Sequence, residues 1–120
     1  MLAKDKSIEQ QDKLTSNSKE ELGLYDDAIE AYKQAIRINP NKAVAYYNLG
    51  SAYDNLCFYK EAIKAFKQAI RIDPDHVNAY YCLGFSYFEI GDKSSALNEY
   101  EILKKLDINL ANELFDFIYK

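Results

Sequence analysis

The chain repeats itself at one fixed offset along the sequence. Residues 25–40 (YDDAIEAYKQAIRINP) and 59–74 (YKEAIKAFKQAIRIDP) are identical at eleven of sixteen positions. At the same offset, the stretch 46–53 shares its tyrosine, leucine and glycine spacing with 80–87. A fixed period of this length indicates one supersecondary unit used several times, with each copy burying its apolar face against the next. The repeat therefore limits the chain to a stack of similar units.

Within each unit the apolar residues recur with a helical period. One stripe in the second unit consists of Ala62, Ile63, Phe66, Ala69 and Ile70. This spacing predicts an amphipathic helix. A proline ends each outer helix, and Asn41 or Asp75 is predicted to cap the next one. Gly23 and Gly91 are predicted to form the turns between paired helices, where a left-handed backbone suits glycine.

The composition favours a folded, acidic, soluble protein. The chain has 120 residues, 48% of them hydrophobic, with 28% charged residues and a net charge of −4. The negative charge argues against nucleic-acid partners and against acidic membrane surfaces. Cys57 and Cys82 are too few for a disulfide framework, which favours free thiols in a reducing compartment. With no apolar leader at the N-terminus and no stretch of membrane-spanning length, we expect a cytoplasmic protein.

Three zones follow along the chain. Residues 1–22 are polar and poorly patterned, and they predict a weak or partial helix that buries little surface. Residues 23–107 carry the repeats, namely the second half of a first unit and two further units. Residues 108–120 form a last amphipathic segment, which fits the solubilising cap that a stack of repeats needs at its end.

The spaced residues resemble the tetratricopeptide repeat (TPR) family. The second unit, 43–76, carries the full signature: Tyr46, Leu49, Gly50, Tyr53, Ala62, Phe66, Ala69 and Pro74. The third unit, 77–110, departs from it at Leu103 and Ile108, and the first, 9–42, matches only in its second half. The resemblance implies an all-α fold, in which antiparallel helix–turn–helix repeats stack as a right-handed solenoid with a C-terminal capping helix.

The register of the repeat continues into the capping segment. Leu114, Phe117 and Ile118 take packing positions of a fourth unit, whereas Glu113 and Asp116 fall on the opposite face. The resemblance also implies that the first helix of each unit lines a concave groove. In this register the groove residues are Tyr47, Ser51, Asp54, Asn55, Asn78, Tyr81, Phe85, Phe88, Glu89, Phe115 and Tyr119.

The aromatic groove residues predict a binding surface for a protein or peptide. Their positions carry no packing role in the family signature, and rigid rings offer a large contact area at a low entropic cost. The carboxylates of Asp54 and Glu89 favour a basic or neutral ligand. A second interpretation is that Phe88, Phe115 and Tyr119 only pack where the capping helix meets the third unit.

A subclass of the family clamps the C-terminal carboxylates of heat-shock chaperones. Lys13, Asn17 and Asn48 match the first three positions of that pattern. Asn78 and Cys82 occupy the two positions where the subclass has Lys and Arg, and the loss of both cations removes most of the charge that holds carboxylates. We therefore interpret the three matching residues as a weak remnant of the clamp.

Other positions carry less chemistry. Cys57 and Phe58 replace the Gly-Asp of the turn, and a left-handed backbone at a cysteine is unfavourable by about 1–2 kcal/mol. Phe58 and Leu24, one repeat apart, could form a second contact edge, or simply reflect sequence drift. His76 stands alone, so we expect no metal site. No nucleophile–base pair, phosphate-binding loop or pair of carboxylates in a pocket is found.

The sequence therefore predicts a non-catalytic interaction module, a scaffold, adaptor or co-chaperone-like protein that binds a peptide segment in an aromatic groove. We expect no cofactor, no metal, and no nucleic-acid or membrane partner. Two alternatives stay open. The chain could be a structural, self-associating module and hence a homo-oligomer, or a non-catalytic interaction segment of a larger assembly. Enzymatic activity of this chain would contradict all of these interpretations.

Overall fold

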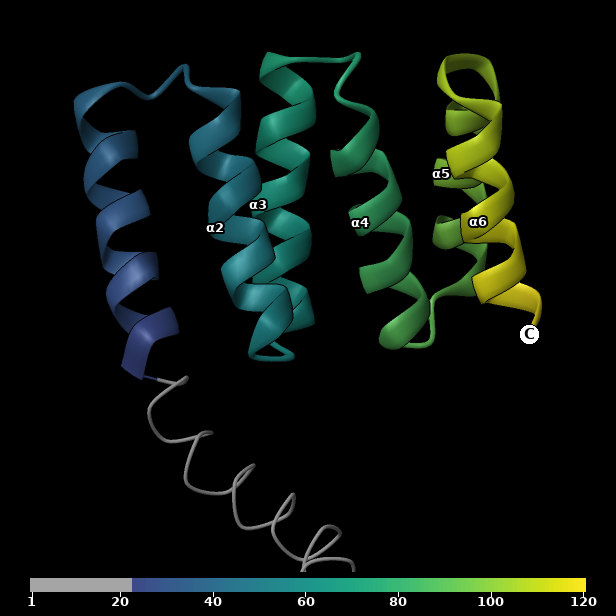
Figure 1. Ribbon diagram of the computed structural model, residues 1–120, viewed down its shortest axis with the longest axis horizontal. Coiled ribbons are helices and arrows are strands. Elements are labelled where there is room, and N and C mark those ends of the chain that lie inside the picture. The colour runs from purple at the N-terminus through teal and green to yellow at the C-terminus, as the bar shows by residue number, and fades with distance from the viewer. Residues whose placement is uncertain (1–22) are drawn as a thin grey trace, which may run out of the picture.

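The computed structural model describes residues 23–120, which form six helices (Figure 1). The first covers residues 23–38 and has no label in the figure. The others are α2 (Ala43–Asn55), α3 (Tyr59–Ile72), α4 (Val77–Glu89), α5 (Lys93–Leu106) and α6 (Ile108–Tyr119). Residues 23–120 contain no strand. The all-α prediction is confirmed, and the predicted weak helix within residues 1–22 lies outside the described residues.

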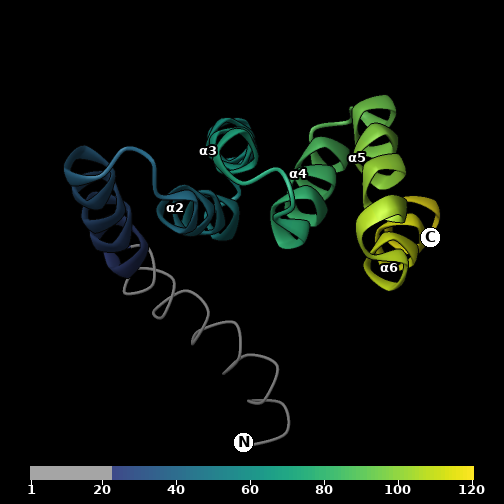
Figure 2. The same ribbon diagram turned by 90° about the horizontal axis from the view of Figure 1, so that it is seen from above.

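The helices form two rows, which Figure 2 shows from above. α3 and α5 lie in one row, and α2, α4 and α6 lie in the other. Successive helices run in opposite directions and are joined by short turns (Figure 1). The arrangement follows from the repeat, because each unit places its first helix in one row and its second helix in the other.

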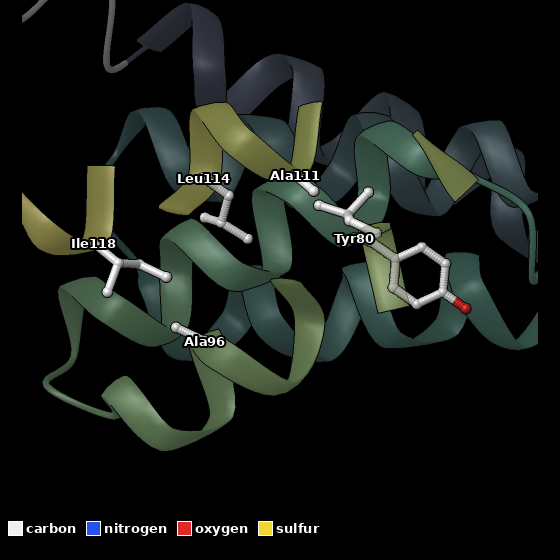
Figure 3. Packing of buried hydrophobic residues seen from close by; sticks show 6 residues of the cluster. Tyr80, Ala96, Ala111, Leu114 and Ile118 are labelled. Atoms are coloured by element: carbon white, nitrogen blue, oxygen red, sulfur yellow. The ribbon is translucent and has the colours of Figure 1, made fainter. Parts of the chain in front are cut away.

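Small residues at fixed positions let the two rows approach closely. Ala62 and Ala69 of α3 are fully buried, as is the ring of Phe66 between them. A β-carbon on Gly50 would lie 2.6 Å from that ring, so only glycine leaves room for it. The last part of the core joins α4, α5 and α6, and Figure 3 shows its members, which include Tyr80, Ala96, Ala111, Leu114 and Ile118.

Two turns between paired helices contain a left-handed residue. Gly91 has φ +86°, and Cys57, at the same place one repeat earlier, has φ +62°. The prediction that Gly23 forms a similar turn is wrong. That residue is helical, which glycine also accepts at a cost of about 1 kcal/mol relative to alanine. Phe58 and Leu24 are both exposed, and a contact edge formed by them stays a prediction.

The predicted caps are wrong by one residue. α2 begins after Lys42, which makes no side-chain capping bond. α4 begins after His76, whose Nδ1 accepts a hydrogen bond from the backbone N–H of Ala79 at 3.2 Å. Asn41 and Asp75 instead donate their backbone N–H groups to side chains two residues earlier, at 3.2 Å in each turn. They complete these turns and do not cap the helices that follow.

The last helix, α6, departs from the register of the repeat. In α4 the buried residues are Ala79, Tyr80, Leu83, Gly84 and Ser86. In α6 they are Ala111, Leu114 and Ile118, while Glu113, the counterpart of Ala79, is exposed. A carboxylate cannot be buried without a partner except at a high cost in free energy. The helix is therefore rolled about its axis, so that Ala111 faces the core in place of Glu113.

Candidate functional site

The predicted binding residues lie on α2, α4 and α6, the helices that share one row in Figure 2. Those that are half-buried are Tyr47, Ser51, Asp54, Tyr81, Phe85 and Phe88. Those that are exposed are Asn55, Asn78, Glu89, Phe115 and Tyr119. The contacts of these side chains divide them into one group that extends from α2 across α4 to α6, and a second group at the far side of α6.

Two tyrosines in this row are held in place by packing. The ring centroid of Tyr47 lies 5.8 Å from that of Phe66 and 4.7 Å from that of His76. Its hydroxyl is 3.9 Å from the sulfur of Cys82, and burial raises the pKa of Tyr47. The expectation that Tyr47 has no packing role is therefore wrong, because one side of its ring covers the core while the other remains accessible. Tyr81 packs in a similar way against the core between α4, α5 and α6.

Four rings meet beside these tyrosines, and we call them the ring cluster: Tyr59, Phe85, Phe88 and Phe117. The ring of Phe85 lies 4.7 Å from that of Phe117 and 6.2 Å from that of Tyr59, between centroids. The ring of Phe88 lies 5.1 Å from that of Phe117, edge to face. The register of the repeat missed Tyr59, and it placed Phe117 at a packing position and not among the rings of the site. Glu113 stands where α4 has the buried Ala79, and this mismatch is the sequence signal for the roll of α6.

Two carboxylates lie next to the ring cluster. Burial raises the pKa of Asp54, and the charge of Glu89 raises it further. The Oδ1 atom of Asp54 is buried and has no hydrogen-bond partner among residues 23–120. The hydroxyl of Tyr59 donates to the sulfur of Cys57 at 3.5 Å, and this bond, burial and the nearby carboxylates together raise the pKa of Tyr59. The raised pKa values of Tyr59 and Asp54 both reflect the negative charge that gathers at this place.

Phe115 and Tyr119 do not belong to the same surface as the ring cluster. The ring of Phe115 lies 5.2 Å from that of Tyr100 on α5 and 4.6 Å from that of Tyr119, between centroids. The ammonium group of Lys93 lies 4.2 Å from the ring centroid of Tyr119. Phe117 faces α4, and residues two apart in a helix point to nearly opposite sides. The structure therefore separates these two rings from the predicted groove.

The remnant of the carboxylate clamp is incomplete in the structure as well. Lys13 and Asn17 lie outside the described residues. Asn48 lines a small cavity between α2 and the helix of residues 23–38. Asn78 is exposed, and burial raises the pKa of Cys82 to about 11, so its thiol stays neutral at pH 7. Neither residue supplies the positive charge that the clamp requires at these positions.

Residues 23–120 have neither a metal-binding cluster nor a membrane-spanning helix. In this part of the chain, no group of three or more His, Cys, Asp or Glu side chains is placed to hold a metal ion. None of the described helices has the length and apolarity needed to cross a membrane. The two cysteines are free thiols, with Cys57 exposed and Cys82 half-buried.

Comparison with known families agrees with this geometry. The family model of the TPR repeat matches residues 20–56 and 59–91, which is more than half of the chain. The chain belongs to the TPR family. Proteins of this family are generally protein-interaction modules, and the TPR fold places the first helices of successive units in one row, as α2, α4 and α6 are placed here. Among proteins of curated function no match is found.

Solved TPR structures show the same fold. MamA from AMB-1 is 31% identical, with a TM-score of 0.66 over 69% of this chain and 49% of its own. A further MamA structure is 28% identical, with a TM-score of 0.68 over 81% of this chain and 66% of its own. The Arabidopsis OM64 TPR domain, at 22% identity and a TM-score of 0.75, covers 86% of this chain and 87% of its own. The chain spans about half the length of the first MamA structures that it matches.

Proposed function

We propose that the chain is a non-catalytic TPR adaptor that binds an extended or helical segment of a partner protein across α2 and α4. The observation that carries this proposal is the ring cluster beside Asp54 and Glu89. Phe85 and Phe88 are half-buried, and their rings are fixed by Phe117. Rings that are already immobilised lose little conformational entropy when a partner covers them.

The charge beside the rings defines the chemistry of the partner. Asp54 and Glu89 each raise the pKa of Tyr59, so both carboxylates lie near the ring cluster. A lysine or arginine side chain bound between them would offset the repulsion between the two carboxylates. Its aliphatic part, or an apolar neighbour, would cover Phe85. The proposed ligand is therefore a segment with a basic residue next to an apolar one.

Selection from a random peptide display library tests this proposal directly. We expect the wild-type chain to enrich peptides with adjacent basic and apolar residues. Tyr81→Ala combined with Phe85→Ala should weaken their binding roughly tenfold or more. Asp54→Asn with Glu89→Gln should remove the preference for the basic residue, because the anionic partner of that residue is lost.

The matched control is Phe58→Ala, which removes an exposed ring outside the proposed face. This variant should bind the selected peptides as the wild type does. If the Tyr81/Phe85 double variant bound the peptides as tightly as the wild type, Tyr81 and the ring cluster would not be the binding site. Enrichment of acidic C-terminal peptides would instead favour the carboxylate clamp.

We also propose that the chain is not an enzyme and acts in the cytoplasm. His76 is the single histidine of the sequence, and it is engaged as the cap of α4 and in packing against Tyr47. It is therefore not free for acid–base chemistry. The free thiols of Cys57 and Cys82 suit a reducing compartment.

A further inference from the structure

The described part of the chain contains half a repeat unit at each end. The helix of residues 23–38 carries the second-half signature, with Ala28, Tyr32 and Ala35 at its packing positions. α6 occupies the place of a first half, next to α4 in its row (Figure 2). A complete unit buries its two halves against one another. Each of these two halves therefore presents a face that a complementary half could cover.

Among residues 23–120, the helix of residues 23–38 has an apolar stripe that is largely uncovered. The stripe consists of Leu24, Ala28, Ala31, Ala35 and Ile38, spaced as successive turns of one helix face. Leu24 is 66% exposed and Ile38 is 84% exposed. One repeat later, Ala62 and Ala69 take the positions of Ala28 and Ala35, and α2 and its neighbours bury both completely. The stripe thus has the composition of a surface that a first-half helix covers.

A cavity marks the place where that helix would lie. It measures about 140 Å³ and lies between the helix of residues 23–38 and α2. Its lining includes Ala28 and Tyr32 on one side and Asn48 and Ala52 on the other. One repeat later, the equivalent place is filled by α2 itself, whose Tyr47 contacts both α3 and α4. The cavity therefore lies at the place against which a first-half helix would pack.

The sequence just before this helix lacks the packing residues of a first half. By the register of the repeat, 9–22 would supply the first half of the unit. Their sequence has Asp12, Thr15, Ser16 and Lys19 at the packing positions. Desolvating a charged or hydroxyl-bearing side chain without partners is unfavourable. The chain contains a better candidate at its other end.

The opposite end of the stack exposes the complementary surface, which we call the terminal edge. It consists of Lys93, Tyr100 and Lys104 of α5, and Ile108, Phe115 and Tyr119 of α6. Phe115 is 39% exposed, Tyr119 is 50% exposed, and Ile108 lies on the same stripe of α6. Bulky rings thus project at this end, and small alanines stand at the other.

We propose that copies of this chain associate head to tail, with α6 of one copy occupying the cavity between the helix of residues 23–38 and α2 of the next. Phe115 and Tyr119 then cover Ala28 and Tyr32, and the two half-units form one complete repeat across the junction. By sequence position α6 would begin a fourth unit and the helix of residues 23–38 ends a first one. Because α6 is rolled and buries Leu114 and Ile118 in its own copy, its contact with the next copy is made by Phe115 and Tyr119. Such an interface is heterologous and does not close by two-fold symmetry.

The charges at the junction are mixed, because Glu113 and Asp116 of α6 are exposed beside the positive Lys93, and they limit its strength. The first turns of the helix of residues 23–38 carry Asp26, Asp27 and Glu30. In the continued register they come next to the amino end of α5, where Lys93 is located. Lys104 stands where the earlier units have isoleucine, and it binds Glu101 at 3.1 Å. A lysine packs less apolar surface than isoleucine does, so the association should be weaker than internal packing and depend on concentration.

Sedimentation of the full chain over a wide range of concentration tests the proposal. The wild type should grow beyond a dimer as concentration rises, because every added copy leaves one free edge. Phe115→Glu disables the terminal edge, and Tyr119→Glu serves as a second variant of the same edge. Ala28→Lys disables the other face, since the equivalent Ala62 is fully buried and leaves no room for a longer side chain. Each change should weaken association roughly a hundredfold.

Mixing the two kinds of variant distinguishes head-to-tail contacts from every other arrangement. Phe115→Glu keeps an intact acceptor face, and Ala28→Lys keeps an intact terminal edge. We expect each alone to be a monomer and the mixture to form a one-to-one dimer that grows no further. Ile102→Glu is the matched control, because Ile102 is also 39% exposed but lies on the other side of α5. It should associate as the wild type does.

Three results would overturn the proposal. The first is a wild-type chain that stays a monomer at all concentrations, as expected if residues 9–22 cover the alanine stripe. The second is a wild-type dimer that grows no further, which indicates a closed two-fold interface. The third is a mixture that remains monomeric although the melting curves show that both variants are folded.

Discussion

The strained turn at Cys57 offers a direct test of how the repeat controls stability. Cys57 has φ +62°, and its counterpart Gly91 has φ +86°. A β-carbon on Gly91 would meet no atom within 4 Å, so a substitution there changes the backbone preference and adds no clash. The two turns are therefore a matched pair, in which one residue suits the conformation and the other does not.

The expected magnitude follows from two opposing terms. A left-handed backbone is unfavourable by about 1–2 kcal/mol for a residue with a β-carbon. Glycine avoids this term but loses more conformational freedom on folding, which costs about 0.5–1 kcal/mol. Glycine at position 57 should therefore raise the free energy of unfolding by about 0.5–1 kcal/mol relative to alanine at the same position. Gly91→Ala should lower it by a similar amount.

Cys57→Ala is the correct reference for this comparison. Tyr59 donates a hydrogen bond to the Cys57 sulfur at 3.5 Å, and both Cys57→Ala and Cys57→Gly remove it. Urea unfolding and thermal melting of the four proteins measure the difference, which corresponds to a shift in melting temperature of about 2–5 °C. If Cys57→Gly were no more stable than Cys57→Ala, the backbone at this turn would not be strained. If Gly91→Ala were as stable as the wild type, the left-handed backbone at this turn would not require glycine, which would also refute the reasoning.

Three other substitutions test the packing between units, each by urea unfolding. Burial raises the pKa of Glu99 to about 7 while Lys67 opposes the shift, so the stability that Glu99 contributes at low pH is lost as the pH rises through 7. Glu99→Gln should therefore raise the free energy of unfolding by about 1–2 kcal/mol at pH 8, a value reduced for the partial exposure of the side chain. At pH 4 the variant and the wild type should be equally stable. Equal stability at pH 8 would contradict this. Ser86 is fully buried, and its hydroxyl has no hydrogen-bond partner in the described part of the chain. Ser86→Ala should therefore raise the free energy of unfolding by about 0.5–1 kcal/mol, and a decrease would show that the hydroxyl has a partner. Gly50→Ala places a β-carbon 2.6 Å from the Phe66 ring. The cost of overpacking, about 1–3 kcal/mol, should outweigh the gain of about 1 kcal/mol in helix propensity, so the variant should be less stable. A more stable variant would show that the ring can move.

Most of the fold could be predicted from the sequence because the repeat encodes its own packing. The period and the apolar stripe identify Ala62, Phe66 and Ala69 as buried, and all three are fully buried in the structure. The turn at Cys57 was also predictable, since its counterpart in the next unit is Gly91. Each of these features depends on contacts within one unit or between adjacent units of the same kind.

The candidate site was less predictable because it depends on the one helix that leaves the register. The position of Ala79 in α4 is taken by Glu113 in α6, and the position of Gly84 is taken by Ile118. A charged residue resists burial, and a branched side chain prevents the close approach that glycine allows. A register that is based on sequence spacing alone takes account of neither the cost of burying a charge nor the size of the side chain. It therefore placed Phe115 in the groove, whereas the structure brings Phe117 to α4.

The roll of α6 also connects the two proposed surfaces physically. Phe117 completes the ring cluster on one side of the helix, while Phe115 lies on the terminal edge. The ring cluster and the terminal edge share no side chain, so partner binding at the rings does not require association. The cavity that would receive α6 is lined by Ser51 and Asn55 of the predicted groove, so the two proposed surfaces meet on α2. In the proposed head-to-tail contact, α2 of the next copy would lie beside α6 of the first. The row formed by α2, α4 and α6 would then continue into the same three helices of the next copy. A partner with two suitable segments could then bind across the junction, and the second contact would form at a high effective concentration.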